Sequence, residues 1–173
     1  MSIIDVMVLG FLAEGPQHGY ELRRKIEQLY GHTRRISDGT LYPATDRLER
    51  NGYVVKKSEP GRGRAGRHTL TITDAGRTHL LEAIRTADGH DITDASRFFV
   101  VLTFLSLLPH RSDQHAVLRR RLEFLETPAS FFYDGDRPVR AEEVADPYRR
   151  GLLLTARATS AAERAWIREE IDS

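Results

Sequence analysis

The loop from Gly61 to Arg67, with the sequence GRGRAGR, combines three glycines with three arginines. Its glycines have the Gly-x-Gly-x-x-Gly spacing of a turn that binds the pyrophosphate of a dinucleotide. Such a turn must follow a strand and open a helix, because the helix N-terminus faces the pyrophosphate. Here the segment after the loop, HTLTIT (68–73), alternates like a strand, and no strand-helix-strand unit surrounds it. We therefore reject the dinucleotide interpretation.

Two interpretations of this loop remain. It could be an ordinary hairpin tip, which is polar because loop tips face water. It could instead belong to the basic wing (residues 59–67) of a DNA-binding domain, whose arginines donate to backbone phosphates or enter a minor groove. We favour the wing, since Lys56 and Lys57 extend its positive surface along the preceding strand.

The charge distribution supports a polyanionic partner for the first half of the chain alone. The net charge is only +1, but residues 18–70 hold twelve Lys/Arg against six Asp/Glu. From residue 91 onward, twelve Arg stand against fourteen Asp/Glu. A basic N-terminal half joined to a slightly acidic C-terminal half predicts that only the former meets nucleic acid.

The elements that must position the wing follow from the spacing of apolar residues. Helical periodicity predicts helices over 3–14, 18–30 and about 38–51, the last capped by Ser37 or Asp38. After Gly52 the period changes to two, which predicts strands over 53–58 and 67–73, and Thr73 then restarts a helix. Three helices followed by a hairpin is the order of a winged helix-turn-helix, in which the helix over 38–51 is the recognition helix for a major groove.

The second half is predicted to be helical over 92–108, 112–126 and 146–171, with an irregular stretch at 127–144 that contains an Asp134-Gly135 turn. The segment 92–108 is apolar on most faces, so it must be buried in its own domain or against another chain. The predicted fold class is therefore mostly α (α+β). We expect a winged helix-turn-helix domain over 1–89 and an all-helical domain over 90–173 that dimerises and could bind an effector.

Several classes of protein are excluded by what the sequence lacks. With no cysteine there is no disulfide framework and no thiolate metal site. The apolar runs are too short to cross a membrane and no secretory leader is recognisable, so a cytoplasmic protein is expected. No His-Glu-x-x-His, nucleophile-elbow or phosphate-loop motif occurs. We expect no catalysis, no metal, no cofactor and no membrane partner.

Several motifs resemble one known family. They are HGYEL (18–22), IS (36–37) with GTLYPA (39–44), RLE (47–49) with Gly52, and LTITDAGR (70–77) after the wing. These runs are similar to the PadR family of bacterial winged-helix regulators. The resemblance implies a homodimeric transcriptional repressor that dimerises through its C-terminal helices and is often released by a small ligand. Thr45-Asp46 departs from the family, which usually has a leucine and then often a basic residue there, and Thr69 stands where an aromatic is common.

The residues that we predict to contact double-stranded DNA belong to the entry of the helix-turn-helix, the recognition helix and the wing. Tyr42 and Arg47 are expected to face base edges. Asp46 would face a polyanion unless it pairs with Arg50 at i+4. The full set is His18, Tyr20, Ser37, Thr40, Tyr42, Pro43, Arg47, Arg50, Lys56, Lys57, Arg62, Arg64 and Arg67.

The only tryptophan, Trp166, has two interpretations. It could anchor an interface or a core, or it could form one wall of a ligand pocket with Phe98, Phe99 and Phe104.

The function also has an alternative. A protein-interaction adaptor could keep the winged-helix fold without specific DNA binding; the basic wing argues against this and Asp46 argues mildly for it.

Overall fold

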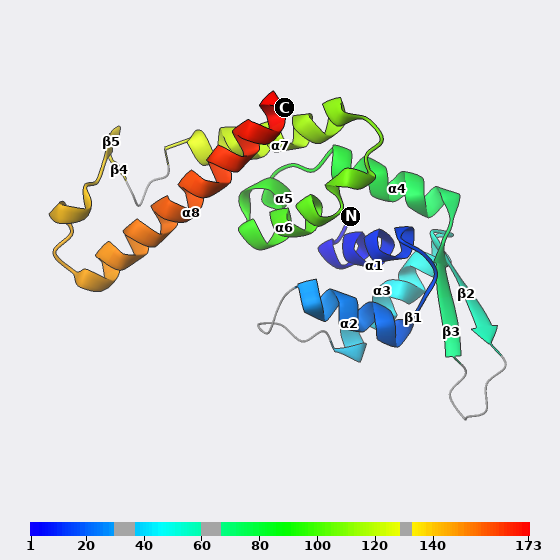
Figure 1. Ribbon diagram of the computed structural model, residues 1–173. Coiled ribbons are helices and arrows are strands. Elements are labelled where there is room, and N and C mark those ends of the chain that lie inside the picture. Colours follow the sequence, from blue (N-terminus) through cyan, green and yellow to red (C-terminus); the bar gives the residue numbers. More distant parts are fainter. Residues whose placement is uncertain (30–36, 60–66, 129–132) are drawn as a thin grey trace. The chain divides into compact units, whose positions relative to one another are not determined.

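The computed structural model describes residues 1–29, 37–59, 67–128 and 133–173 (Figure 1). It divides into two compact units, Met1–Pro109 and His110–Ser173. The predicted division at residue 89 differs from this one, because the residues just after it fold with the first unit. None of the described helices is long and apolar enough to span a bilayer.

The first unit has the predicted order of helices, hairpin and helix. Its core is built on one helix, α1, in which Val8, Leu9 and Leu12 are fully buried. Ser2 Oγ caps this helix by accepting a hydrogen bond from Asp5 N, and Ser2 N in turn donates to Asp5 Oδ2. The elements are α1 (Ile3–Ala13), β1 (Gln17–His18), α2 (Gly19–Leu29), α3 (Asp38–Arg50), β2 (Val54–Glu59), β3 (Arg67–Ile72), α4 (Asp74–Arg85), α5 (His90–Thr93), α6 (Ala95–Thr103) and the 3₁₀ turn η2 (Leu105–Leu107).

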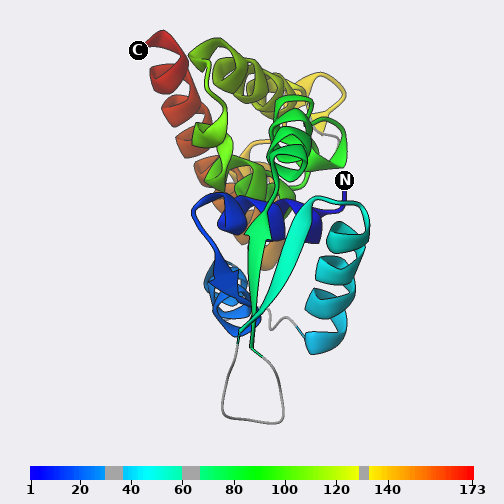
Figure 2. The same cartoon turned by 90° about the vertical axis from the view of Figure 1, so that its right-hand side faces the viewer.

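The sheet has three strands rather than the two that the sequence predicts. Gln17 and His18 pair with Leu70 and Thr69, which gives the antiparallel order β1-β3-β2. Helix α2 therefore begins at Gly19 instead of His18, and His18 N donates to Glu21 Oε2 at 3.0 Å. That hydrogen bond is the main reason that the pKa of Glu21 is lowered. Figure 2 looks onto the sheet, with α3 beside β2 and α2 beside β3.

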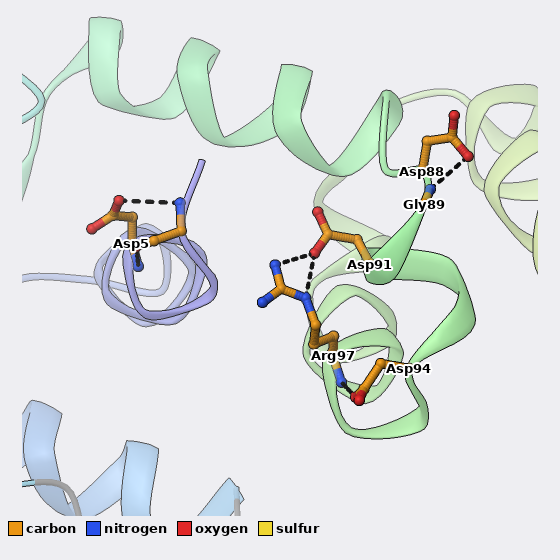
Figure 3. Close-up of polar contacts among 7 residues, drawn as sticks. Asp5, Asp88, Gly89, Asp91, Asp94 and Arg97 are labelled. Carbon is orange, nitrogen blue, oxygen red and sulfur yellow. Dashed lines mark hydrogen bonds and ion pairs between the residues drawn. The ribbon is translucent and has the colours of Figure 1, made fainter.

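The apolar segment 92–108 is not one helix, contrary to the prediction. Asp94 interrupts it and caps α6 by accepting a hydrogen bond from Arg97 N at 2.9 Å. The guanidinium of Arg97 turns back to Asp91, where Nε and Nη2 donate to Oδ1 at 2.8 and 2.5 Å (Figure 3). The chain thus bends sharply between α5 and α6, which lets α6 pack on α1.

The contact between α1 and α6 is tight. The ring of Phe104, directly after α6, packs edge-to-face on Phe11 at 5.1 Å between centroids. A Cβ at Gly10 would lie 2.6 Å from that ring, so only glycine fits at this point of α1. This packing explains why the first compact unit extends to Pro109.

The base of the hairpin is fixed by the start of α4. Thr73 caps α4 by accepting a hydrogen bond from Gly76 N at 3.0 Å, and Thr73 N donates to Tyr53 O. Gly76 lies directly against the same carbonyl: a Cβ there would be 2.2 Å from Tyr53 O. The ring of Tyr53 also stacks on His79 at 4.3 Å. The close approach of Gly76 to Tyr53 O therefore fixes the start of α4 against the residue that precedes β2.

The second unit is a pair of long helices with a small hairpin between them. Arg121 of α7 is only 3% exposed, and its Nε and Nη2 donate to Oε1 and Oε2 of Glu163 in α8 at 2.7 and 3.0 Å. Gly135 has a φ of 61°, which confirms the predicted turn at Asp134-Gly135. The elements are α7 (Arg111–Glu126), β4 (Tyr133–Asp134), β5 (Arg137–Pro138), the 3₁₀ turn η4 (Ala141–Glu143) and α8 (Pro147–Asp172).

Candidate nucleic-acid interface

One concave surface joins the predicted recognition helix to the predicted wing strands. Its walls are the start of α2, the outer side of α3, and strands β2 and β3, and it encloses about 660 Å³. We call it the α3–sheet groove. Its side chains include His18, Tyr20, Tyr42, Asp46, Lys56 and His68. Four of the predicted DNA contacts therefore come together in one groove from four different elements: His18 of β1, Tyr20 of α2, Tyr42 of α3 and Lys56 of β2.

Two exposed tyrosines mark the helical side of the groove. Tyr20 is 57% exposed and Tyr42 is 52% exposed, so two large aromatic side chains of the groove lining face solvent. His18 stacks on Tyr20 with 5.8 Å between ring centroids, and Thr69 Oγ1 lies 3.5 Å from His18 Nδ1. The ring of Tyr20 is thus held from the sheet side through His18, and its hydroxyl donates to Glu21 Oε1 at 3.2 Å.

Lys56 is held by two carboxylates of α3. Its Nζ forms ion pairs with Asp46 Oδ1 and, at 3.0 Å, with Glu49 Oε2. Burial by itself lowers the pKa of Lys56, but the hydrogen bonds to Asp46 and Glu49 outweigh burial and raise that pKa. The partner of Asp46 is thus Lys56 of β2, where the sequence had suggested Arg50. Lys56 is therefore positively charged, but the carboxylates of Asp46 and Glu49 offset this charge within the protein.

Arg47 connects α3 to the beginning of α1. Its Nη2 forms an ion pair with Asp5 Oδ1 and lies 3.5 Å from Ser2 Oγ. Asp5 is nearly buried. The guanidinium of Arg47 therefore gives this carboxylate a charged partner in addition to its hydrogen bond within the Ser2–Asp5 capping box at the N-terminus of α1. The role of Asp5 is not predictable from the sequence, because Asp5 and Arg47 are 42 positions apart and no local spacing relates them. Contact between Arg47 and a base, as predicted, would require this pair to open.

The remaining predicted DNA contacts are exposed where the structure describes them. Ser37 precedes α3, and its Oγ lies 3.1 Å from Thr40 Oγ1. Pro43, Arg50 and Lys57 are exposed on α3 and β2. Two further arginines, Arg62 and Arg64, lie outside the described residues, as does the side chain of Arg67, whose backbone begins β3.

The four aromatic residues predicted to line an effector pocket have different surroundings. Phe98 and Phe104 are buried in the core of the first unit. Phe99 and Trp166 are exposed, Phe99 on α6 and Trp166 on α8 of the second unit. Their binding of a ligand stays a prediction. Among the residues described, no cluster of His, Asp and Glu could hold a metal ion.

Comparison with protein families places these elements in a known context. The model of the Transcriptional regulator PadR-like family matches residues 8–82, which span α1 to α4. The transcriptional regulator Rv3488 of Mycobacterium tuberculosis is 36% identical over 81 residues, which are 47% of this chain and 72% of that protein. A 37.1 kDa protein of transposon TN4556 from Streptomyces fradiae is 44% identical over 78 residues. Those residues are 45% of this chain and only 21% of the transposon protein.

Solved structures with similar folds include regulators of the same kind. A transcriptional regulator from Clostridium thermocellum is 30% identical, with a TM-score of 0.41 over 46% of this chain and 74% of that one. Bacillus subtilis PadR in complex with operator DNA is 17% identical, with a TM-score of 0.48 over 99% of this chain and 98% of that one.

Proposed function

Because this chain belongs to the PadR-like family of transcriptional regulators, we propose that it is a homodimeric repressor that binds an inverted-repeat operator in duplex DNA. The observation that carries the proposal is the α3–sheet groove, which combines exposed aromatic rings and basic side chains on one surface. In this proposal α3 enters the major groove and the basic wing follows the adjacent phosphates.

The exposed side chains in and around the groove have two roles in this proposal. Ser37, Thr40, Arg50 and Lys57 can donate to phosphate oxygens, which fixes the position of the protein on the duplex. Tyr42 offers a hydroxyl and a ring edge to base edges or to a thymine methyl group. Sequence preference would then come from α3, and most of the affinity from the basic residues.

The homodimer is supported by an exposed stripe on α8. Tyr148, Leu152 and Trp166 are exposed there, although each is large and apolar. They are joined by smaller exposed residues at alternating spacings of four and three, which is the repeat of a helix-helix seam. A two-fold axis through such a stripe would separate two recognition helices by about 34 Å or a multiple of it. The dimerisation stripe consists of Tyr148, Leu152, Thr155, Thr159, Ala162 and Trp166.

Release of the DNA by a small ligand is the last part of the proposal. The exposed ring of Trp166 on α8 is an aromatic surface that a small ligand would contact in this proposal. An adaptor without specific DNA binding is the second candidate. The carboxylates that offset Lys56 and Arg47 favour it, because they remove positive charge from the surface that would meet DNA.

Selection from a library of randomised duplexes with the full-length protein tests DNA recognition. We expect an inverted repeat to be enriched, and its affinity to fall about a hundredfold between about 50 and 200 mM salt, as roughly four phosphate contacts would require. Lys57→Ala should weaken binding to all duplexes alike. Lys25→Ala is the control, since Lys25 pairs with Glu14 and is not among the predicted DNA contacts. Absence of any enriched sequence would favour the adaptor.

Replacing Leu152 by glutamate is expected to shift the protein from dimer to monomer at micromolar concentration. A charge on the dimerisation stripe would have to be buried without a partner. Sedimentation velocity of the full chain measures the change. Ala161→Glu adds the same charge at an exposed position off the stripe and should leave the dimer intact. A monomeric wild-type protein, or dimerisation that is equally strong in Leu152→Glu, would contradict the proposed interface.

A further inference from the structure

We propose that Asp46 reads cytosine in the operator: its carboxylate, held by Lys56, accepts a hydrogen bond from the N4 amino group of a cytosine in the major groove. The inference rests on the proposed DNA-binding function and adds a base preference to it. Thr45-Asp46 is also where this chain departs from the family pattern, so a preference for cytosine at this position would be particular to this chain.

Asp46 lies on the part of α3 that faces the α3–sheet groove. It follows Tyr42 by one helical turn, and both line the groove. Its side chain is 59% exposed, so the carboxylate remains in solvent at the surface proposed to meet DNA. An unpaired carboxylate at such a position is repelled by the phosphates around it.

Lys56 removes much of that repulsion and orients the carboxylate. The ammonium binds Asp46 Oδ1 from strand β2, which lies beside α3. Its raised pKa keeps it charged throughout the neutral range. In the part of the chain that the structure describes, Oδ2 of Asp46 has no such partner, and it can therefore accept a hydrogen bond from outside.

Holding Lys56 does not by itself require Asp46, because Glu49 already binds the same ammonium at 3.0 Å. Two carboxylates around one ammonium leave a net negative charge beside the groove. On a surface that binds a polyanion this excess is unfavourable unless the DNA offers a donor to it. The arrangement is thus better explained by recognition of a donor than by anchoring of Lys56.

The chemistry of the major groove selects the donor. A carboxylate only accepts hydrogen bonds. Guanine presents the acceptors N7 and O6, and thymine presents O4, so both are repelled by a carboxylate. Adenine offers N6 as a donor but places the N7 acceptor beside it, which suits an amide better. Cytosine offers its N4 amino group, the donor for which aspartate and glutamate are suited.

The test compares base preferences of full-length variants in the same randomised duplex selection. Wild type should prefer a C·G pair at one position of each half-site. Asp46→Ala should lose that preference by about tenfold or more, and Asp46→Asn should move it toward adenine. Glu49→Gln is the matched control: it removes one carboxylate from Lys56 and should raise affinity for all duplexes while keeping every base preference.

The outcomes separate this inference from the proposed function. If Asp46→Ala and Asp46→Asn keep the wild-type preference at every position, Asp46 acts on charge alone and the inference is wrong, while the proposed function stands. If the wild-type protein enriches no sequence, the proposed function itself fails. Thermal unfolding of both variants, expected to be within a few degrees of wild type because Asp46 is exposed, excludes loss of folding as the cause.

Discussion

Replacing Glu163 by alanine is expected to lower the free energy of unfolding of the second unit by about 3–5 kcal/mol. The change would leave the guanidinium of Arg121, which is 3% exposed, buried without its carboxylate. Breaking one side of a buried ion pair costs more than the pair contributes, because the remaining charge stays desolvated. Trp166 lies on the same helix and is the only tryptophan, so its fluorescence in urea reports the transition of this unit.

The control for this experiment is Glu169→Ala, which removes the same charge from an exposed position of α8 and should change stability by less than about 0.5 kcal/mol. Arg121→Met combined with Glu163→Leu should recover most of the lost stability, since an apolar pair needs no compensation for desolvation. A loss below about 1 kcal/mol for Glu163→Ala would show that water or the other contacts of Arg121, such as that with the Phe124 ring, compensate its charge.

Gly76→Ala is expected to destabilise the first unit by about 3 kcal/mol and to weaken DNA binding. The added methyl would lie 2.2 Å from Tyr53 O, and that carbonyl belongs to the backbone, so it cannot rotate away. Either α4 or the start of β2 must move, and β2 carries the lysines beside the α3–sheet groove. Thermal unfolding followed by circular dichroism, with DNA affinity in parallel, measures both effects.

Gly151→Ala is the matched control for Gly76→Ala. It also adds one methyl inside a helix, but nothing lies within 4 Å of the new atom. Stability should therefore rise slightly, by up to about 1 kcal/mol, as helix propensity predicts. An unchanged melting temperature in Gly76→Ala would mean that the contact between α4 and Tyr53 is looser than the structure has it.

The elements that could be predicted from the sequence are those whose apolar residues repeat at a regular spacing over many positions. Helix α3 and the strands after Gly52 were found because the spacing of apolar residues changes there from about 3.6 to two. Strand β1 was missed because two residues have no period, and their extended conformation depends on pairing with β3, about fifty positions later. The apolar run 92–108 was predicted as one helix, because a single Asp94 within it does not look like a cap.

The partners of charged residues in the candidate interface could not be predicted in the same way. Local rules relate residues three or four apart on one helix, which led to Arg50 as a partner for Asp46. The actual partner, Lys56, comes from a neighbouring strand, and Arg47 binds Asp5 of α1. Such pairs depend on how elements pack, and that information is not contained in the spacing of one element.

Helix α1 makes two contacts with distant parts of the chain, one near each end. Near its beginning Asp5 binds Arg47 of the recognition helix, and near its end Gly10 touches Phe104, a few residues before the first unit ends at Pro109. Because no empty space separates Gly10 from the ring, a displacement of Phe104 must push α1 as a whole. A twist of the chain where it leaves the unit would thus act on α3 through the part of α1 between Asp5 and Gly10, which is about 7.5 Å long.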